Sequence, residues 1–443
     1  MNNNPARKWS VALLAVSLLC LAFFIARGEE AVQTSQPHSL ISVQLNDSKP
    51  DTSLVAVPEP SAKALRHYRS GLVLLGAFIL WTPLLPALFL FTGLSARMRS
   101  WAERLGRKWY FIFALYGLAF GLVYYLVSLP LSYYAGFVRP HSYDLSNQTL
   151  GRWLGNYIKG ATVTILIGLA VGWIPFLLIK KSPCRWWLYL GLMAPPLLCV
   201  MQLLQPVLIE PLYYKFQPLQ NKALESKILA QATRAGIEGS RVYEVNQSVD
   251  TRTLNAYVAG FMGTKRIVFW DTILKTLDED ELLFILGHEM GHFMLRHIIK
   301  SIAFSSVLIL LSLYAVHLLA ARIIARFKNR FGFIAMSDFA ALPLGLLLIQ
   351  IITFVGLPVP MAFSRHLEHE ADRFGLELTH NNRAAATAFA KIQQENLGIP
   401  RPGTIPRIWL FTHPSIGERI DFFNSYSPWE SGQPSHYEEY FKR

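Results

Sequence analysis

Long stretches without a charged side chain constrain the fold of this chain more than any other feature. Seven stretches lack Asp, Glu, Lys and Arg and approach or exceed the roughly 20 helical residues that cross a bilayer. They are Trp9–Ala26, Gly71–Leu94, Trp109–Val138, Gly160–Ile179, Trp186–Ile209, Ser301–Ala321 and Phe339–Ser364. A buried helix of a soluble protein rarely runs this long without a charge. The chain is therefore predicted to be an all-α membrane protein with about seven transmembrane helices.

The composition agrees with a membrane protein and argues against a nucleic-acid partner. Of the 443 residues 52% are hydrophobic and only 16% are charged, whereas soluble domains carry about 25% charged residues. The net charge of +13 comes from Lys and Arg that cluster between the apolar stretches rather than on one basic face. The expected partner is the lipid bilayer, with no nucleic acid. Three cysteines without a CxxC pair predict neither a disulfide framework nor a thiolate metal site.

The basic clusters also predict an orientation. If all seven stretches cross, Arg7–Lys8, Arg97–Lys108, Lys180–Arg185 and Arg322–Arg330 fall on one side of the membrane. By the positive-inside rule that side is the cytoplasm, so the segment 210–300 and the C-terminal tail face outward. Trp9–Ala26 could also be a cleaved signal, but the residues after it lack a small-x-small site, so a retained anchor is favoured.

Three regions follow from this pattern: an N-terminal anchor and polar loop over 1–70, a transmembrane domain over 71–209, and a C-terminal domain over 210–443. The third region contains two membrane helices, 301–321 and 339–364, and polar segments. Its polar segments predict a helix over Ala223–Ala235, short strands at Arg241–Val245 and Arg266–Trp270, and a helix over Arg365–His380. Another helix starts at Asp278, with Glu281 three residues on as in a capping box.

The chemistry lies in His288-Glu-Met-Gly-His292, an HExxH pattern. Residues four apart share one face of a helix, so the two imidazoles can bind one metal ion. Glu289 lies beside them, where it can accept a proton from a water molecule. The alternative is a pair of hydrogen-bonded histidines on an amphipathic helix.

A catalytic zinc normally takes three protein ligands and leaves one position open. Glu368 is the best candidate for the third, because it begins a polar helix beyond the last two apolar stretches. Asp372 lies one turn later on the same face and can accept a hydrogen bond from the outer nitrogen of a ligand histidine. His366 and His369 are competing ligands by chemistry, although ordinary polar helix residues are the favoured reading of both.

Three further residues are assigned no role in the metal site. Glu370 points away from the face that carries Glu368. His297 is nine residues from His288, half a turn out of phase on a continuous helix, and is interpreted as structural. His317, alone in an apolar stretch, is interpreted as a packed core residue.

Taken together, these segments resemble the type I CAAX prenyl endopeptidases, a membrane branch of the gluzincin metalloproteases. The resemblance covers roughly residues 110–422. Its motifs are Pro206–Leu219, Asn255-Ala-Tyr257, Lys265–Asp271, Gly287–His292, Ser364-Arg365, Glu368-x-x-Ala-Asp372, Asn396-Leu-Gly398 and His413-Pro-x4-Arg419.

The resemblance implies a role for each matching residue. His288, His292 and Glu368 would bind one zinc ion per chain, and Glu289 would be the general base. Asn255 would hold the substrate backbone. His413 and Arg419 would face the cleft and stabilise the oxyanion or the bound peptide. The implied fold is a ring of seven helices around a water-filled chamber, with a gluzincin-type catalytic domain that contains a few short strands.

Two departures from the family matter. Where family members carry Glu-Lys-His-Gly-Phe-Asn, this chain reads His141-Ser-Tyr-Asp-Leu-Ser146, and it lacks the charged insertion that eukaryotic members place before HExxH. Those members also face the cytosol, whereas the basic clusters here orient the site outward. We therefore predict an enzyme of a bacterial inner membrane whose active site faces the periplasm.

The predicted function is zinc-dependent hydrolysis of peptide bonds in a peptide or protein substrate. One alternative is a quality-control metalloprotease of the heat-shock type, which has fewer membrane spans. Another is a non-catalytic transporter or structural protein with a vestigial zinc site. The intact Glu289 favours the enzyme, because a degenerate site loses its base at little structural cost.

Overall fold

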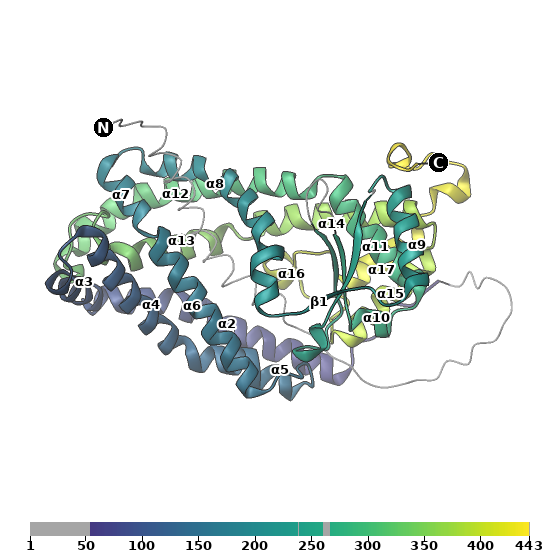
Figure 1. Ribbon diagram of the computed structural model, residues 1–443, viewed down its shortest axis with the longest axis horizontal. Coiled ribbons are helices and arrows are strands. Elements are labelled where there is room, and N and C mark those ends of the chain that lie inside the picture. Colours follow the sequence, from purple (N-terminus) through teal and green to yellow (C-terminus); the bar gives the residue numbers. More distant parts are fainter. Residues whose placement is uncertain (1–53, 238, 260–265, 443) are drawn as a thin grey trace.

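The computed structural model describes residues 54–237, 239–259 and 266–442; Figure 1 shows an all-helical half joined to a half that contains a small sheet. Six helical segments in these residues are long and apolar enough to cross a membrane. They are Ala62–Phe91 (α2), Trp109–Ser142 (α4, α5), Leu150–Lys181 (α6, α7), Trp186–Leu212 (starting with α8), His297–Phe331 (α12) and Phe339–Gly356 (containing α13). Each apolar stretch from Gly71 onward is therefore helical; Trp9–Ala26 lies outside the described residues.

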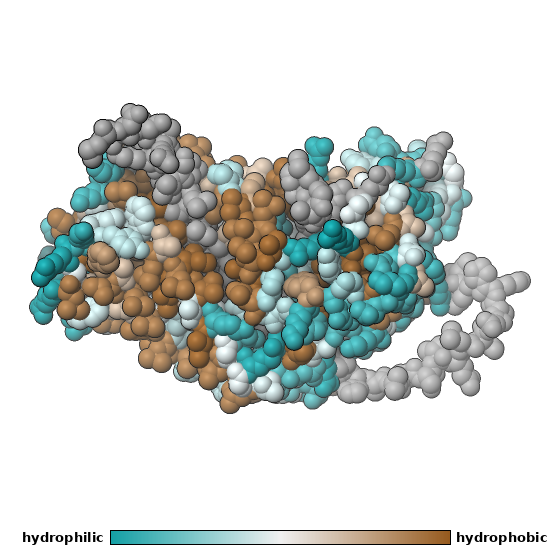
Figure 2. Space-filling model, viewed as in Figure 1, coloured by the Kyte–Doolittle hydropathy of each residue, from teal (hydrophilic) through white to brown (hydrophobic). Residues whose placement is uncertain are grey.

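The side chains of these helices are exposed to an extent that only lipid can accommodate. Between 17% and 39% of the most apolar window of each helix is buried in the protein. Leucines such as Leu80 and Leu126 are about 70% exposed, at 71% and 69%. Figure 2 shows these apolar side chains gathered over the helical half, while polar side chains cover the half with the sheet. A water-soluble protein rarely exposes so large an apolar surface.

The last apolar stretch differs from the single span predicted for it. α13 (Leu342–Gly356) ends just before Pro358, and a new helix, α14 (Pro358–Thr379), starts there. Proline lacks the N–H that a helix interior needs, so it is favoured in a first helical turn. α14 thereby joins the end of the apolar stretch to the predicted helix Arg365–His380, and this one helix carries Glu368.

The other half contains the sheet and the remaining helices. Its helices are Lys222–Arg234 (α9), Ile273–Thr276 (α10), Glu279–Met294 (α11), α14, Asn382–Glu395 (α15), Thr404–Leu410 (α16) and Ile416–Ser425 (α17). Its strands are Phe216–Pro218 (β1), Arg241–Val245 (β2), Ala256–Ala259 (β3) and Arg266–Trp270 (β4), in the order β1-β2-β4-β3. β2 and β4 pair in parallel, with Arg241 opposite Arg266, and have the predicted bounds. β3 is antiparallel to β4 and forms an edge of the sheet.

Glycines bring α11 and α14 into close contact. A Cβ atom on Gly291 would lie 3.1 Å from the Cα of Ala371, and one on Gly375 would lie 3.0 Å from the backbone N of His288. Around this contact Phe284, Phe374 and Phe423 are fully buried. The two helices that carry the predicted metal ligands are thus held together backbone to backbone.

The connections between membrane helices divide between two ends of the molecule. At one end, on the left of Figure 1, α3 (Leu94–Leu105) packs near the turn after α12, where Arg99 contacts Asp338 and the backbone of Gly332. At the other end the chain before α2 reaches the catalytic half, where the Val55 backbone and the Asn424 side chain exchange two hydrogen bonds. Ser146, in the turn after α5, pairs with Thr251 at this same end.

Candidate metal centre

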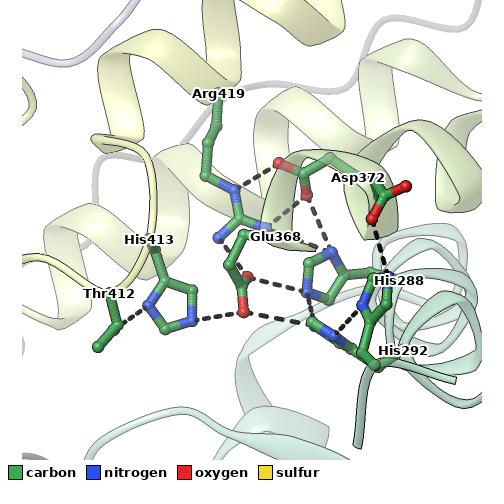
Figure 3. A network of polar contacts seen from close by, with 9 residues as sticks. His288, His292, Glu368, Asp372, Thr412, His413 and Arg419 are labelled. Atoms are coloured by element: carbon green, nitrogen blue, oxygen red, sulfur yellow. Dashed lines mark hydrogen bonds and ion pairs between the residues drawn. The ribbon is translucent and has the colours of Figure 1, made fainter. Parts of the chain in front are cut away.

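The HExxH pattern lies on α11, whose start is fixed by a capping box. The Asp278 side chain accepts a hydrogen bond from the backbone N–H of Glu281, and the Glu281 side chain accepts one from the N–H of Asp278, as predicted. The helix then runs unbroken to Met294, so His288 and His292 present their rings on one face. Figure 3 shows both rings pointing toward Glu368 of α14.

Three potential ligand atoms converge at this point. The Nε2 atoms of His288 and His292 lie 3.1 Å apart. In Glu368, Oε2 lies 3.3 Å from Nε2 of His288 and Oε1 lies 3.4 Å from Nε2 of His292. Ligands at the corners of a tetrahedron around zinc, with bonds of about 2.0–2.1 Å, are separated by about 3.3 Å. One ligand atom from each of the three side chains lies within 4.8 Å of the others, so the group could hold a single metal ion.

The charges in this cluster also favour a cation. Glu368 is 7% exposed, and its Oε2 atom is buried without a hydrogen-bond donor. Burial opposes the charged form of this carboxyl group, yet the neighbouring imidazoles lower its pKa well below the usual value. Burial also favours a neutral His288 ring, but the neighbouring carboxylates of Asp372 and Glu368 raise its pKa to about 9. The buried carboxylates thus favour positive charge at the imidazoles, as a proton or as a metal ion.

Asp372 and Arg419 form a buried support behind His288. The Nδ1 atom of His288 lies 2.9 Å from Oδ1 of Asp372, the contact expected for a residue that fixes the ring of a ligand. The Arg419 guanidinium donates to both oxygens of Asp372, at 2.8 and 2.5 Å. Arg419 is 5% exposed, and its Nη1 atom also lies 3.9 Å from Oε2 of Glu368. A buried guanidinium requires a carboxylate partner, and Asp372 provides it.

Glu289 and His413 complete the immediate surroundings. Burial raises the pKa of Glu289, partly offset by the two ligand histidines. His413, in the turn before α17, places Nε2 3.3 Å from Oε1 of Glu368, and its side chain is 54% exposed. It therefore contacts both the ligand cluster and the solvent-accessible side of the site. Its Nδ1 atom lies 2.7 Å from the Thr412 hydroxyl.

Asn255 lies immediately before the edge strand β3. Its side-chain oxygen accepts a hydrogen bond from the N–H of Ala256, and its backbone carbonyl accepts one from Trp270. Two residues after Asn255, the Tyr257 hydroxyl donates a hydrogen bond to the Glu210 carboxylate at 2.6 Å. Asn255 is exposed beside a strand that has one neighbour in the sheet.

Sequence reasoning missed His297 and Glu370. His297 was expected to lie out of phase with the HExxH helix, but that helix ends at Met294, and Arg296 adopts a left-handed conformation with φ 57°. The chain turns, and His297 lies with its Nδ1 2.9 Å from Nδ1 of His292. On the other side of the His297 ring, Oε2 of Glu370 lies 3.4 Å from Nε2. No sequence signal marks this break, because the residue at the left-handed position is not glycine.

The competing histidines lie apart from the three converging ligands. The His366 side chain is 68% exposed and lies 3.7 Å from Glu370. The His369 ring packs on Phe422 with a centroid distance of 4.5 Å. His317 contacts Trp186, Trp187 and Tyr314, as expected for a packed histidine. In the part of the chain that the structure describes, one group of His, Cys, Asp and Glu side chains fits a metal: His288, His292 and Glu368.

A helical membrane domain joined to a His-His-Glu centre defines a membrane-embedded metallopeptidase. Comparison with known families agrees: the model for peptidase family M48 matches residues 218–426, and the model for the CAAX prenyl protease N-terminal region, described as five membrane helices, matches residues 78–215. The chain belongs to peptidase family M48. It is a membrane metalloendopeptidase that acts on peptide or protein substrates.

Individual relatives support this assignment. The metalloprotease YhfN of Bacillus subtilis is 34% identical over 426 residues, which cover 94% of this chain and 96% of YhfN. A CAAX prenyl protease 1 homolog of Dictyostelium discoideum is 29% identical over 323 residues, covering 72% and 74%. The crystal structure of Ste24p from S. mikatae has the same fold, with a TM-score of 0.69 at 21% identity over 93% of this chain and 98% of Ste24p.

Proposed function

We propose that the metal is zinc, held by His288, His292 and Glu368, one ion per chain. The observation that carries this proposal is the convergence of two Nε2 atoms and one carboxylate within 3.1–3.4 Å of one another. Two neutral imidazoles and a carboxylate are a ligand set typical of catalytic zinc. When bound, zinc polarises the scissile carbonyl and makes a water molecule acidic.

The residues around the ligands divide the remaining work. Glu289 accepts the proton of the attacking water and then returns it to the leaving amine. Its raised pKa, which burial causes, suits a group that must both take and give a proton near neutral pH. His413 reaches the site from the exposed side, so its imidazole is placed to donate to the carbonyl oxygen as negative charge develops there. Arg419 and Asp372 act through His288 and orient its ring.

The substrate backbone is proposed to lie along β3. This edge strand pairs with β4 on one side, and an extended peptide adds to such an edge by backbone hydrogen bonds. Asn255, exposed at the start of β3, is placed to hold that peptide. Relatives at 27–29% identity are named CAAX prenyl proteases. For this chain we propose peptide or small-protein substrates, without a requirement for a prenyl group.

The catalytic half is proposed to lie outside the cytoplasm. The predicted basic clusters lie on α3, in the turn between α7 and α8, and at the end of α12. These three segments are at the end of the membrane helices opposite the metal centre (Figure 1). Short basic loops remain on the cytoplasmic side. A bacterial inner membrane with the site facing the periplasm fits this distribution.

A comparison of cells that express the wild type and the Glu289→Gln variant tests the function. The variant keeps the ligands and loses the base, so substrates should accumulate in its membrane fraction and their cleavage products should disappear. Quantitative proteomics of both fractions, searching for new peptide termini, identifies them. Identical termini in the two strains would contradict a peptidase that depends on Glu289.

A further inference from the structure

The two ligand histidines are supported by different groups. Behind His288 lies the carboxylate of Asp372, held by Arg419. Behind His292 lies another imidazole: its Nδ1 atom is 2.9 Å from Nδ1 of His297, with the two rings nearly perpendicular at 75°. His297 is 3% exposed, so water does not replace this contact.

The backbone between α11 and α12 turns so that His297 can contact His292. On a continuous helix, His297 would be five residues from His292 and rotated by about 140° from it. Instead α11 ends, Arg296 takes φ 57° and ψ 37°, and His297 begins α12. Such a conformation is costly for a residue with a Cβ atom and persists only where surrounding contacts maintain it. The contact between the two histidines is one that this turn makes possible.

The direction of the hydrogen bonds follows from the geometry. His292 presents Nε2 to the other ligands, so that nitrogen must keep its lone pair and the ring proton must be on Nδ1. That proton is donated to Nδ1 of His297, which leaves the proton of His297 on its Nε2 atom. Oε2 of Glu370 lies 3.4 Å from this buried nitrogen, which makes no hydrogen bond within the described residues. Lys300 donates to the same oxygen at 3.2 Å.

We propose that His297, whose outer nitrogen lies beside the Glu370 carboxylate, is a positioning residue for the metal ligand His292. It holds His292 in the tautomer whose Nε2 lone pair faces the metal, and it fixes the rotation of the ring. Groups that hydrogen-bond a ligand histidine typically change metal affinity by about 10–100-fold when they are removed. The inference rests on the proposed zinc site, because it assigns His297 a role through one of its ligands.

Asp372 behind His288 and His297 behind His292 give the two ligand histidines different basicity. A carboxylate behind His288 makes that imidazole a more basic donor, whereas the neutral imidazole behind His292 adds no charge. His297 is also the first residue of a membrane helix, and Glu370 is on the helix that carries Glu368.

Zinc affinity, measured by competition with a chelator in purified protein, tests the role of His297. We expect His297→Leu to weaken zinc binding by about 10–100-fold and Glu370→Ala to weaken it less. His297→Gln should recover part of the loss, because its amide oxygen can accept the His292 proton. His366→Gln is the matched control: it is an exposed neighbour of Glu370 and is expected to bind zinc like the wild type.

Thermal unfolding with and without zinc separates positioning from a purely structural role. Ligand binding to the folded state raises the midpoint by an amount that falls as affinity falls. His297→Leu should therefore reduce the rise that zinc causes. A lower metal-free midpoint with an unchanged rise would overturn the inference, as would wild-type affinity. If His297→Leu does not fold, equal affinity in Glu370→Ala and His366→Gln overturns it. A wild type that binds no zinc would refute the proposed function instead.

Discussion

Glu289 and Glu368 are the same residue type in one site, and their surroundings separate their roles. Glu368 lies among three imidazoles, which lower its pKa, so it remains an anion suited to binding a metal. Burial raises the pKa of Glu289, which brings it closer to the pH at which a base must also release its proton. The physical cause is the balance between burial and neighbouring positive charge, which differs at the two positions.

Replacing Glu289 by Gln should remove catalysis and spare the metal. The amide cannot accept a proton at neutral pH, so we expect kcat to fall by at least about 100-fold, the lower range for general acid–base catalysis. Metal content per chain and the unfolding midpoint should stay as in the wild type. A fluorogenic peptide assay beside metal analysis measures both quantities. Cleavage at the wild-type rate would rule out Glu289 as the base.

Replacing Glu368 or His288 by Ala should instead release the metal. Either change leaves an incomplete set of ligands, so purified protein should retain well under one zinc per chain after dialysis. His366→Ala is the control, since its side chain is 68% exposed. Full metal content in Glu368→Ala would mean that another group, with His369 and His366 the first to examine, is the third ligand. Chelator treatment of the wild type should likewise abolish activity, and added zinc should restore it.

At the scale of elements, the metal centre depends on how closely α11 and α14 approach. Gly291 lies between the ligands His288 and His292 in the sequence and against Ala371 and Phe374 in space. A methyl group there would meet the Cα of Ala371 at 3.1 Å and the Cβ of Phe374 at 3.0 Å. Neither neighbour is the end of a flexible side chain, so the helices must separate.

Gly291→Ala should therefore destabilise the protein by about 1–3 kcal/mol, the usual cost of overpacking. Because Glu368 moves with α14, zinc affinity should fall as well. Gly155→Ala is the matched control: it is also a helical glycine, and a Cβ atom there meets nothing within 4 Å. Unfolding midpoints in detergent and chelator competition compare the two variants. Equal behaviour would show that the helices have room at Gly291.

At the scale of the whole molecule, three contacts between connecting segments agree with alternate crossing of the membrane helices. The turn after α5 and the segment before α2 contact the catalytic half through Ser146 and Val55, while α3 contacts the turn after α12 at the opposite end. Any two connecting segments at the same end of the molecule are separated by an even number of membrane helices in the sequence. These contacts agree with six helices that each cross once, which is the condition for the predicted orientation.

Reporter fusions test the orientation that we propose. Alkaline phosphatase fused after Arg443 should be active and green fluorescent protein there should be dark, because the tail lies outside the cytoplasm. The opposite pattern is expected for reporters inserted in the turn between α7 and α8, which carries Lys181 and Arg185. Fluorescence from the C-terminal fusion would place His413 and Arg419, and the metal centre with them, in the cytoplasm.

The sequence by itself determined the elements whose signals are local. Runs without charge predicted six of the described membrane helices, and the bounds of β2 and β4 and the capping box at Asp278 also match. Hydrophobicity, strand periodicity and helix capping act between residues near in sequence, so a single chain displays them. The resemblance to a family extended the prediction to His413 and Arg419, which spacing alone could not select.

Only the tertiary structure decided which groups support the ligands. Arg419 lies buried against Asp372, and His297 contacts His292 across a left-handed turn at Arg296. α14 starts at Pro358, inside the last apolar stretch, and continues to Thr379. The physical reason is shared by all three. Each depends on packing between α11, α12, α14 and α17, and the free energy of a buried charge or a strained turn is set by partners distant in sequence.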